Sequence, residues 1–443
     1  MKPIIRNIDS FKLLIFPERQ YDSSIYILKG VATVVVPLYL QGLQVNDIYT
    51  KIHTDRRRSA RVSADIQHIH HIVQFLDSVM NNHSDSSTIS DVTAFMSNEL
   101  EDLDQYSISS NIPLYCGIEP TWKCNFKCHH CYIRTCDRQE LSLKNWKMLL
   151  DSIADSGVVY LTITGGEPFL YEGFKELYRY AKSKGFVITI YTNGTLIDES
   201  LIELFTTLPP KRIEISIYGI TQATYYKMTG IKNSYNNFLQ GFNLLSQLRD
   251  RTEIALKTII VKDNVTEYEK MRQFAEEYSL SLASNFVLWT RIDSNKANLL
   301  CQLSAQDIVR FEEKDPSISS SWNEYPNSTP ISANQSDTIS CYAGKTLFSV
   351  DCEGYAGYCI GYRSPHINLR TTPLPDVWEV MQRNREHFLA KPSKCKQCKY
   401  RSFCDFCPVC GVLQGGDKHS ITSYMCDIAK NRFEYYAETS EHS

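Results

Sequence analysis

The first 115 residues of this 443-residue chain contain no cysteine, although the whole chain contains fifteen. Five cysteines fall between Cys116 and Cys136, Cys301 stands alone, and the other nine lie between Cys341 and Cys426. A disulfide framework is not expected, because thiols stay reduced in the intracellular compartment that the sequence indicates. The cysteines therefore predict metal or thiolate chemistry in two separate regions.

The sequence also lacks an excess of charge and a long apolar run. Its formal net charge of −3 gives no reason to expect a nucleic-acid surface. The stretch GVATVVVPLYLQGL is too short to span a bilayer and contains Pro37. The opening MKPIIRNIDS has no apolar core of the kind that signal peptides carry. We therefore expect a cytoplasmic chain of two or three domains with neither a nucleic-acid nor a membrane partner.

From Leu114 onward, apolar runs alternate with amphipathic helical patterns. The six strand-like runs are LYCGIEP, VVYLTIT, FVITIYT, RIEISIY, IALKTIIV and NFVLW. Nearly continuous apolar runs are typical of strands buried on both faces, as in a parallel sheet. Their spacing of roughly 30 to 45 residues fits βαβ units. The expected fold class is α/β, with an incomplete (β/α)6 TIM-like barrel whose chemistry lies on loops at the C-terminal strand ends.

The regions outside the barrel are predicted from composition and periodicity. Residues 1–111 are expected to form a small α+β extension with a linker, since FKLLIF and ATVVV are strand-like runs. One helical face there carries Ile66, Ile69, Val73, Leu76 and Met80. The expected regions that follow are the partial barrel at 112–291, a Ser- and Asn-rich bridge at 292–340, a cysteine-rich iron–sulfur module at 341–430 and a polar tail at 431–443.

The stretch CNFKCHHCYIRTC follows the first barrel strand, where a barrel places its active site. Cys124, Cys128 and Cys131 have the spacing C-x3-C-x2-C. With one of the two adjacent histidines they would complete a structural zinc site, and Cys136 fits a free thiol. Three thiolates also suit an iron–sulfur cluster, which normally takes four cysteines, so that one iron keeps an open position. A catalytic site needs that open position, because a small molecule can then bind the metal directly.

In this position the pattern resembles that of the radical S-adenosylmethionine (SAM) enzymes. The resemblance implies a 4Fe–4S cluster whose open iron binds the amino and carboxylate groups of SAM. It implies reductive cleavage of SAM to a 5′-deoxyadenosyl radical, which then removes a hydrogen atom from the substrate. It also implies that the corner around His130 and Tyr132 packs against the adenine.

Loops at later strand ends resemble the same family. TGGEP ends the second strand and resembles the loop that binds the SAM methionine, where glycines let the backbone approach closely and Glu167 faces the ammonium. TNGT ends the third strand, Ser216 ends the fourth and Lys257 lies on the fifth. Taken singly, these features also fit ordinary turns and a surface lysine. The residues that the resemblance assigns to SAM are Gly165, Gly166, Glu167, Pro168, Thr192, Asn193, Ser216, Tyr132 and Lys257.

The second cysteine region fits either a pair of zinc ribbons or a more specific pattern. C-x12-G-x4-C followed by C-x2-C-x5-C resembles the SPASM extension, which carries two auxiliary 4Fe–4S clusters. By this resemblance one cluster is held by Cys395, Cys398, Cys404 and Cys426, and the other by Cys341, Cys359 and Cys407 with Cys352, Cys410 or a substrate in the fourth position. The family pattern has three residues after the position of Cys404 where this chain has two, so the choice between Cys407 and Cys410 stays open.

The SPASM resemblance implies an oxidoreductase that modifies peptides or proteins. We expect it to mature a ribosomally synthesised precursor peptide by crosslink or thioether formation, with electrons from a donor such as flavodoxin or ferredoxin. Residues 1–111 are a candidate recognition element for that peptide. One alternative is a formylglycine-type sulfatase maturase, although Ile360 stands where that group carries an aspartate after the second SPASM cysteine. The other alternative is a non-catalytic protein that binds iron–sulfur clusters or zinc.

Overall fold

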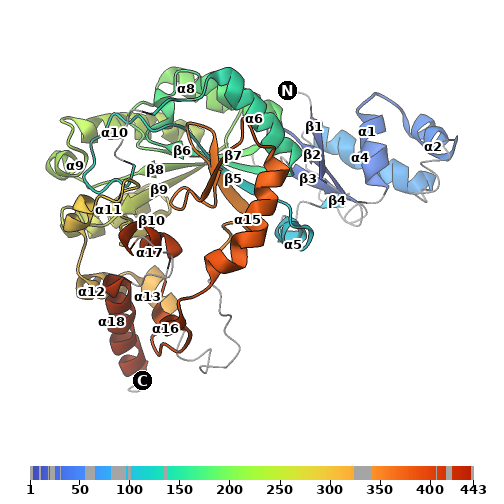
Figure 1. Ribbon diagram of the computed structural model, residues 1–443. Helices are drawn as coiled ribbons and strands as arrows, with labels where there is room; N and C mark the ends of the chain where they lie inside the picture. The colour runs from blue at the N-terminus through green and yellow to red at the C-terminus, as the bar shows by residue number, and fades with distance from the viewer. Residues whose placement is uncertain are drawn as a thin grey trace.

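The computed structural model shows a central α/β body with an N-terminal lobe beside it and a C-terminal group of helices (Figure 1). The structure describes residues 3–8, 11–17, 19, 25–29, 31–54, 65–80, 96–97, 101–133, 138–323, 341–405, 407–415 and 422–440. No helix within these ranges combines the length and the apolar character that crossing a bilayer requires.

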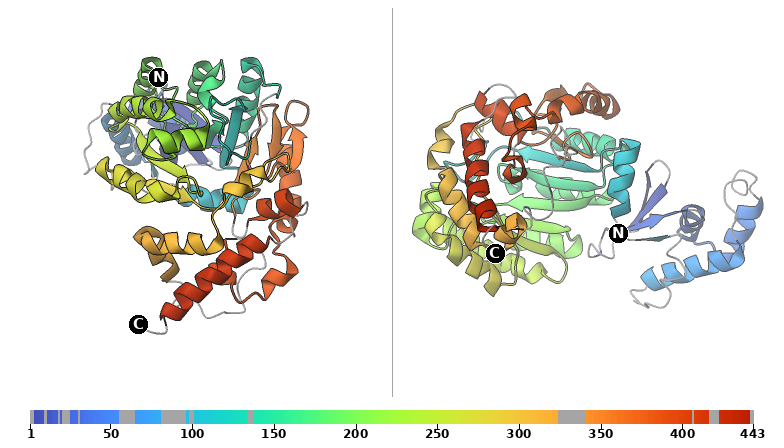
Figure 2. Two further views of the ribbon diagram at one scale, coloured as in Figure 1. Left: turned by 90° about the vertical axis from the view of Figure 1, so that its left-hand side faces the viewer. Right: turned by 90° about the horizontal axis from the view of Figure 1, so that it is seen from below.

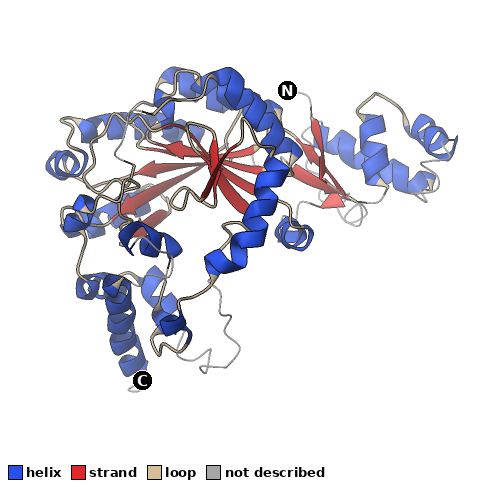
Figure 3. Cartoon of the chain, viewed as in Figure 1, coloured by secondary structure: helices blue, strands red, loops and turns tan. Residues whose placement is uncertain are grey.

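The central body contains six parallel strands that are neighbours in chain order. They are β5 (Tyr115–Thr121), β6 (Tyr160–Gly165), β7 (Val187–Thr192), β8 (Arg212–Ser216), β9 (Glu253–Ile259) and β10 (Leu282–Asn285). Helices cover the outer face of this sheet (Figure 3), namely α6 (Leu143–Asp155), α7 (Phe174–Ser183), α8 (Glu199–Thr207), α9 (Gln222–Thr229), α10 (Ser234–Leu245) and α11 (Tyr268–Glu277). The predicted α/β fold with its largely parallel sheet is confirmed.

The two faces of the parallel sheet differ in polarity. In β7, Ile188 and Ile190 are fully buried within the main hydrophobic core, which includes residues of the covering helices. Thr189 and Tyr191 alternate with them and are half-buried on the opposite, inner face. Glu214 on β8 is the register partner of Tyr191 and lies on the same inner face. The inside of the partial barrel is therefore lined by polar groups.

The cysteine-rich C-terminal part shares this sheet. Strand β11 (Leu347–Val350) pairs in parallel with β5, and β12 (Tyr355–Gly357) and β13 (Pro365–Asn368) continue the sheet in antiparallel order. Helix α15 (Leu374–Leu389) packs over this extension, where Trp378 lies 5.9 Å from Phe348 between ring centroids. The module expected at 341–430 is thus joined to the barrel by a hydrogen-bonded strand.

The N-terminal lobe is an antiparallel sheet with helices on one face. Its strands are β1 (Ile4–Ile8), β2 (Phe11–Ile15), β3 (Ile25–Leu28) and β4 (Met96–Ser97), and its helices are α1 (Ala32–Tyr39), α2 (Val45–Thr54) and α4 (Ile66–Met80). Leu14 faces these helices, whereas Leu13 and Ile15 pack on Val159 and Val187 beside the starts of β6 and β7. The lobe therefore docks at the N-terminal ends of the barrel strands and projects from the body (Figure 2).

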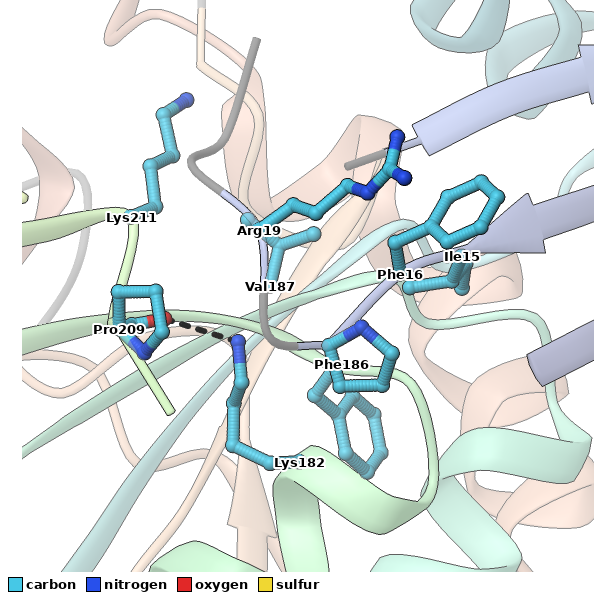
Figure 4. Close-up of a pocket in the computed structure, with 9 residues that line it drawn as sticks. Ile15, Phe16, Arg19, Lys182, Phe186, Val187, Pro209 and Lys211 are labelled. Carbon is cyan, nitrogen blue, oxygen red and sulfur yellow. Dashed lines mark hydrogen bonds between the residues drawn. The ribbon is translucent and has the colours of Figure 1, made fainter. Parts of the chain in front are cut away.

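A small pocket lies at this junction (Figure 4). Lys182 of α7 is buried there and donates a hydrogen bond of 2.8 Å to the carbonyl of Pro209, while Phe16 and Arg19 of the lobe line the other side. Arg6 of the lobe donates a hydrogen bond of 2.6 Å to Ala154 O of the barrel. The lobe is thus held by polar contacts as well as by its apolar face.

Two predicted strands are wrong. ATVVV forms the first turns of α1 instead of a strand, because Val35 and Val36 are fully buried against the lobe helices and this packing outweighs the strand preference of valine. The sixth barrel strand ends at Asn285, so the rest of NFVLW lies beyond it. In the part of the linker that the structure describes, α5 (Glu101–Ser110) is helical.

The C-terminal helices cross the expected region boundaries. Helix α18 (Ser423–Ser440) continues through the predicted boundary at 430, so the described part of the expected tail is helical. Its Arg432 is buried and paired with Glu312 of α12 (Ala305–Lys314). Helix α13 (Pro316–Asn323) follows α12, and α16 (Ser393–Lys396) and α17 (Pro408–Gly415) complete the group. The expected bridge and the expected tail therefore pack together.

Candidate functional site

Three thiols face one another in the loop that follows β5. Cys128 is buried and Cys124 and Cys131 are half-buried, and a charge on Cys131 opposes ionisation of both other thiols. Burial raises the pKa of the Cys124 thiol to about 12. Backbone N–H groups of Phe126 and Ile133 donate to Cys124 and Cys131 at 3.4 Å. Such a set needs a cation to hold it as thiolates, which an iron–sulfur cluster supplies.

The two adjacent histidines are turned to other partners. His129 Nε2 lies 2.9 Å from Asp263 Oδ2, and His130 is buried with its ring centroid 5.2 Å from that of Tyr218. Nowhere in the described ranges do three His, Cys, Asp or Glu side chains converge as they would on one metal ion. A 4Fe–4S cluster binds each thiolate through a different iron, so its ligands stand further apart than those of zinc. The donor set therefore fits a cluster better than a zinc ion.

The two glycines of TGGEP lie against the backbone that leads into the cysteine loop. Gly165 has a φ of +116°, and a Cβ there would lie 2.4 Å from Thr121 O. A Cβ on Gly166 would lie 2.1 Å from Lys123 O. The N–H groups of Gly166 and Glu167 donate to those same two carbonyls at 2.9 and 2.8 Å. Only glycine permits this approach, which fixes the loop directly beside Cys124.

Glu167 joins the TGGEP loop to the TNGT loop. Its side chain is fully buried, Oε2 accepts from Asn193 N at 2.8 Å, and Oε1 accepts from Thr192 Oγ1 at 2.8 Å and Phe169 N at 3.4 Å. Burial raises its pKa to about 7 against these hydrogen bonds. The expectation from sequence was a carboxylate facing the SAM ammonium, and it did not include these partners. Pro168 begins the short 3-10 turn that follows (Pro168–Leu170).

Asn193 continues the same network into the cysteine loop. Its Nδ2 donates to Asn125 Oδ1 at 2.8 Å and lies 4.0 Å from Cys124 Sγ. Asn125 Nδ2 donates in turn to Thr195 Oγ1 at 2.8 Å. The structure thus brings the cysteine loop, TGGEP and TNGT together at neighbouring strand ends.

The other residues assigned from sequence lie around this centre. Tyr132 is half-buried, with its ring centroid 5.5 Å from that of Trp289. Ser216 ends β8 and is the register partner of Lys257 on β9. Lys257 Nζ lies 3.3 Å from a Glu214 oxygen and 4.1 Å from the centroid of the Tyr191 ring. The anion beside Lys257 is therefore Glu214, on the inner face of the barrel.

The C-terminal cysteines form two groups. Cys359 faces Cys341 and Cys407, and Cys410 lies beside Cys407. Cys352 is apart from them, fully buried with Trp122 and Ile133 in a cluster against which Cys131 also packs. Of the two candidates for the fourth position, the structure places Cys410 beside this group. Cys136 lies outside the described residues.

A buried arginine connects the helix and the loop that carry two cysteines of the second group. Cys395 faces Cys398 and Cys426, and Cys426 lies on α18. Arg432 of the same helix donates to Phe403 O at 3.2 Å and to Asp405 Oδ2 at 2.8 Å, on both sides of Cys404. The helix that carries Cys426 is thus fixed to the loop that carries Cys404.

One buried ion pair was missed from the sequence. Glu119 of β5 is fully buried and accepts from Arg363 Nη2 at 3.1 Å and Trp122 Nε1 at 3.1 Å. The guanidinium carbon of Arg363 also lies 4.5 Å from the centroid of the Trp122 ring. An acidic residue inside the apolar run LYCGIEP was the only signal of this site, and it does not reveal a partner 244 residues away.

Comparisons with known proteins bear on the barrel and on the whole fold separately. Residues 118–275 match the family model of the radical SAM superfamily. The chain is 32% identical over 160 residues to Fe-coproporphyrin III synthase of Methanosarcina barkeri, covering 35% of this chain and 39% of that protein. It is 30% identical over 165 residues to the antilisterial bacteriocin subtilosin biosynthesis protein AlbA of Bacillus subtilis, covering 37% and 36%. The matched segments thus span well under half of each relative.

The likeness in structure extends over nearly the whole chain. The crystal structure of Streptococcus suis SuiB bound to its precursor peptide SuiA covers 95% of this chain and all of that one, with a TM-score of 0.58 and 16% identity. At this identity the likeness concerns the fold, and it includes the N-terminal lobe and the cysteine-rich C-terminal part.

Proposed function

Because residues 118–275 are a radical SAM domain, we propose that this chain is a radical SAM/SPASM oxidoreductase that matures a peptide. It cleaves SAM reductively to a 5′-deoxyadenosyl radical and abstracts hydrogen from a ribosomally synthesised precursor peptide, forming a crosslink or a thioether. The observation that carries this proposal is the group of three facing thiols, Cys124, Cys128 and Cys131, beside the TGGEP and TNGT loops.

The residues of this centre fit the cofactor without a fourth protein ligand. When bound, a 4Fe–4S cluster supplies an electron and an open iron position for SAM. Gly165 and Gly166 keep the TGGEP backbone close to the cysteine loop, where carbonyls and N–H groups can face the methionine part of SAM. Glu167 holds this loop to Asn193, and Tyr132 closes the corner proposed for the adenine. Tyr191, Glu214 and Lys257 offer polar contacts to substrate on the inner face.

The auxiliary cysteines are proposed to hold two further clusters. One cluster would be held by Cys341, Cys359, Cys407 and Cys410, supported by the interactions of Cys359 with Cys341 and Cys407 and of Cys410 with Cys407. The other would be held by Cys395, Cys398, Cys404 and Cys426, supported by the interactions of Cys395 and Cys426 with Cys398. Clusters near the substrate can accept the electron that is lost when a substrate radical forms a bond. This ligand assignment replaces Cys352 by Cys410, since Cys352 is buried elsewhere.

A peptide substrate is supported by the relatives and by the fold. AlbA is named for biosynthesis of the bacteriocin subtilosin, and SuiB was crystallised with its precursor peptide. The N-terminal lobe, residues 1–111, carries an antiparallel sheet to which a leader peptide can add as a further strand. A formylglycine-type maturase is less well supported, because Ile360 follows Cys359.

Anaerobic reconstitution tests the reaction class. The purified chain should contain iron and sulfide in near-equal amounts and should release 5′-deoxyadenosine from SAM when reduced. Cys128→Ala should abolish this release, whereas Cys301→Ala, which removes a buried thiol bonded to Asn298 O, should retain it. Unchanged cleavage by Cys128→Ala would rule out the assigned ligands. Coexpression with a short peptide encoded beside the gene should change the mass of that peptide.

A further inference from the structure

Exposed lysines and apolar side chains adjoin the cysteine loop on one surface of the barrel. We define the lysine patch as Lys127, Tyr226, Lys227, Lys262 and Leu300. Leu300 is 79% exposed and Tyr226 49%, and all three lysines are exposed. No sequence pattern connects these residues, which come from four loops or helix ends.

Hydrogen bonds and a shared buried cluster make the patch continuous. Lys127 N donates to Thr229 O at 2.8 Å, so the cysteine loop lies against the end of α9, which carries Tyr226 and Lys227. Lys262 N donates to Cys301 O at 2.9 Å, and its Nζ donates to Leu300 O at 3.1 Å. Met228 of α9, Val261 and Cys301 share one buried cluster beneath the surface.

The charge of the patch is positive. Asp263 lies in its middle, but its two oxygens are engaged by Lys227 Nζ at 2.7 Å and His129 Nε2 at 2.9 Å. The positive charges of Lys127 and Lys262 therefore remain at the surface beside the exposed Leu300. An exposed apolar side chain beside charges of one sign suits a transient docking surface for a partner of opposite charge.

We propose that the lysine patch docks a small acidic electron-transfer protein of the flavodoxin class. The inference rests on the proposed function, because SAM cleavage requires one electron from outside the chain for each turnover. In the docked complex the donor is oxidised by one electron and the iron–sulfur cluster is reduced by one. Lys127 stands directly before Cys128, so a donor seated on the patch lies against the loop that ligates the cluster.

The test compares binding and activity in two matched variants of the reconstituted holoenzyme. Lys262→Glu with Leu300→Asp changes the patch without touching a proposed ligand, and Lys144→Glu reverses an exposed charge on α6 as the control. Calorimetry with a bacterial flavodoxin should show the dissociation constant of the patch variant rising about tenfold or more, and that of the control unchanged. Carbodiimide coupling should join flavodoxin carboxylates to Lys127 or Lys262 of the wild type, and binding should weaken with salt.

Turnover with two reductants separates this proposal from the proposed function. With reduced flavodoxin the patch variant should release 5′-deoxyadenosine about tenfold more slowly, whereas with dithionite it should match the wild type. Equal flavodoxin binding by both variants, or coupling only to lysines elsewhere, would overturn the docking proposal alone. Failure of the wild type to cleave SAM with dithionite would instead overturn the proposed function.

Discussion

Glu119 and Arg363 form an ion pair between the first barrel strand and the hairpin of the cysteine-rich part, with Arg363 Nη2 3.1 Å from Glu119 Oε1 and the arginine side chain 16% exposed. Glu119 has no exposed surface, and Trp122 donates to its other oxygen. The pair lies beside Tyr132, whose pKa is raised above its ordinary value by burial and, to a smaller degree, by the negative charge of Glu119. It therefore connects the barrel, the corner next to Cys131 and the auxiliary region.

Breaking this pair should destabilise the whole chain. Arg363→Met leaves a buried carboxylate without its cation, so we expect the free energy of unfolding to fall by about 3 to 5 kcal/mol, measured by urea denaturation. Arg138→Met is the matched control, because Arg138 also lies over Trp122, at 5.4 Å, but pairs with the partly exposed Glu353. Its loss should be below about 1 kcal/mol. Equal losses in the two variants would contradict this account.

Lys182 should make stability depend on pH in the alkaline range. Burial lowers its pKa from the ordinary 10.5 to about 8. Between these values the unfolded chain binds a proton that the folded chain has released, so stability should rise as the pH increases from about 8 to 10.5. Below pH 8 the charged amine costs about 3 kcal/mol, so Lys182→Met should be more stable at pH 7 and should lose this slope.

The control for Lys182 lies on the same helix. Lys175→Met removes an amine that bonds Ser200 at the surface, and the slope of stability between pH 8 and 10.5 should persist in this variant. Thermal denaturation at several pH values measures both variants. A slope that survives in Lys182→Met would show that the buried amine is not its source.

The two candidate cysteines for the first auxiliary cluster should behave differently. Cys410→Ala should lower the iron content and alter the electron paramagnetic resonance signal of that cluster, because Cys410 lies beside Cys407. Cys352→Ala should keep its full iron content, since its thiol is buried with Trp122 and Ile133. The reverse result would assign the fourth position to Cys352.

Glu167→Gln should weaken SAM binding while the cluster remains. A glutamine has one acceptor oxygen, so either Asn193 N–H or Thr192 Oγ1 would face an amide NH2 group, at a cost of about 1 to 3 kcal/mol. We expect the KM for SAM to rise about tenfold or more, with unchanged iron content. Glu172→Gln, an exposed site five residues further on, serves as the control. An unchanged KM in Glu167→Gln would show that Glu167 does not position the loop proposed to bind SAM.

Local patterns predicted the parallel strands well because the apolar residues of each run reflect the burial of that strand. Runs such as FVITIYT carry the apolar residues that face the helices, and the structure places β7 there. ATVVV failed because its environment is set by distant helices, which bury Val35 and Val36. The pairing of β11 with β5 joins Phe348 to Cys116 across more than 200 residues, and nothing local in either strand encodes it.

The same limit applies to the site. Spacing alone predicted Cys124, Cys128 and Cys131 as ligands, because ligands of one cluster must be close in a short loop. It could not identify the partners of Glu167, nor separate Cys352 from Cys410, since both questions depend on how loops from different strands meet. Arg363 likewise has no local mark that would connect it to Glu119.

The parallel ladder between β5 and β11 has a consequence for how long a substrate must be. Because one hydrogen-bonded sheet carries the loop with Cys124 and, through β12, the loop with Cys359, the sheet sets the separation of the two proposed cluster sites. A substrate that reaches both sites must therefore supply the necessary length and flexibility itself.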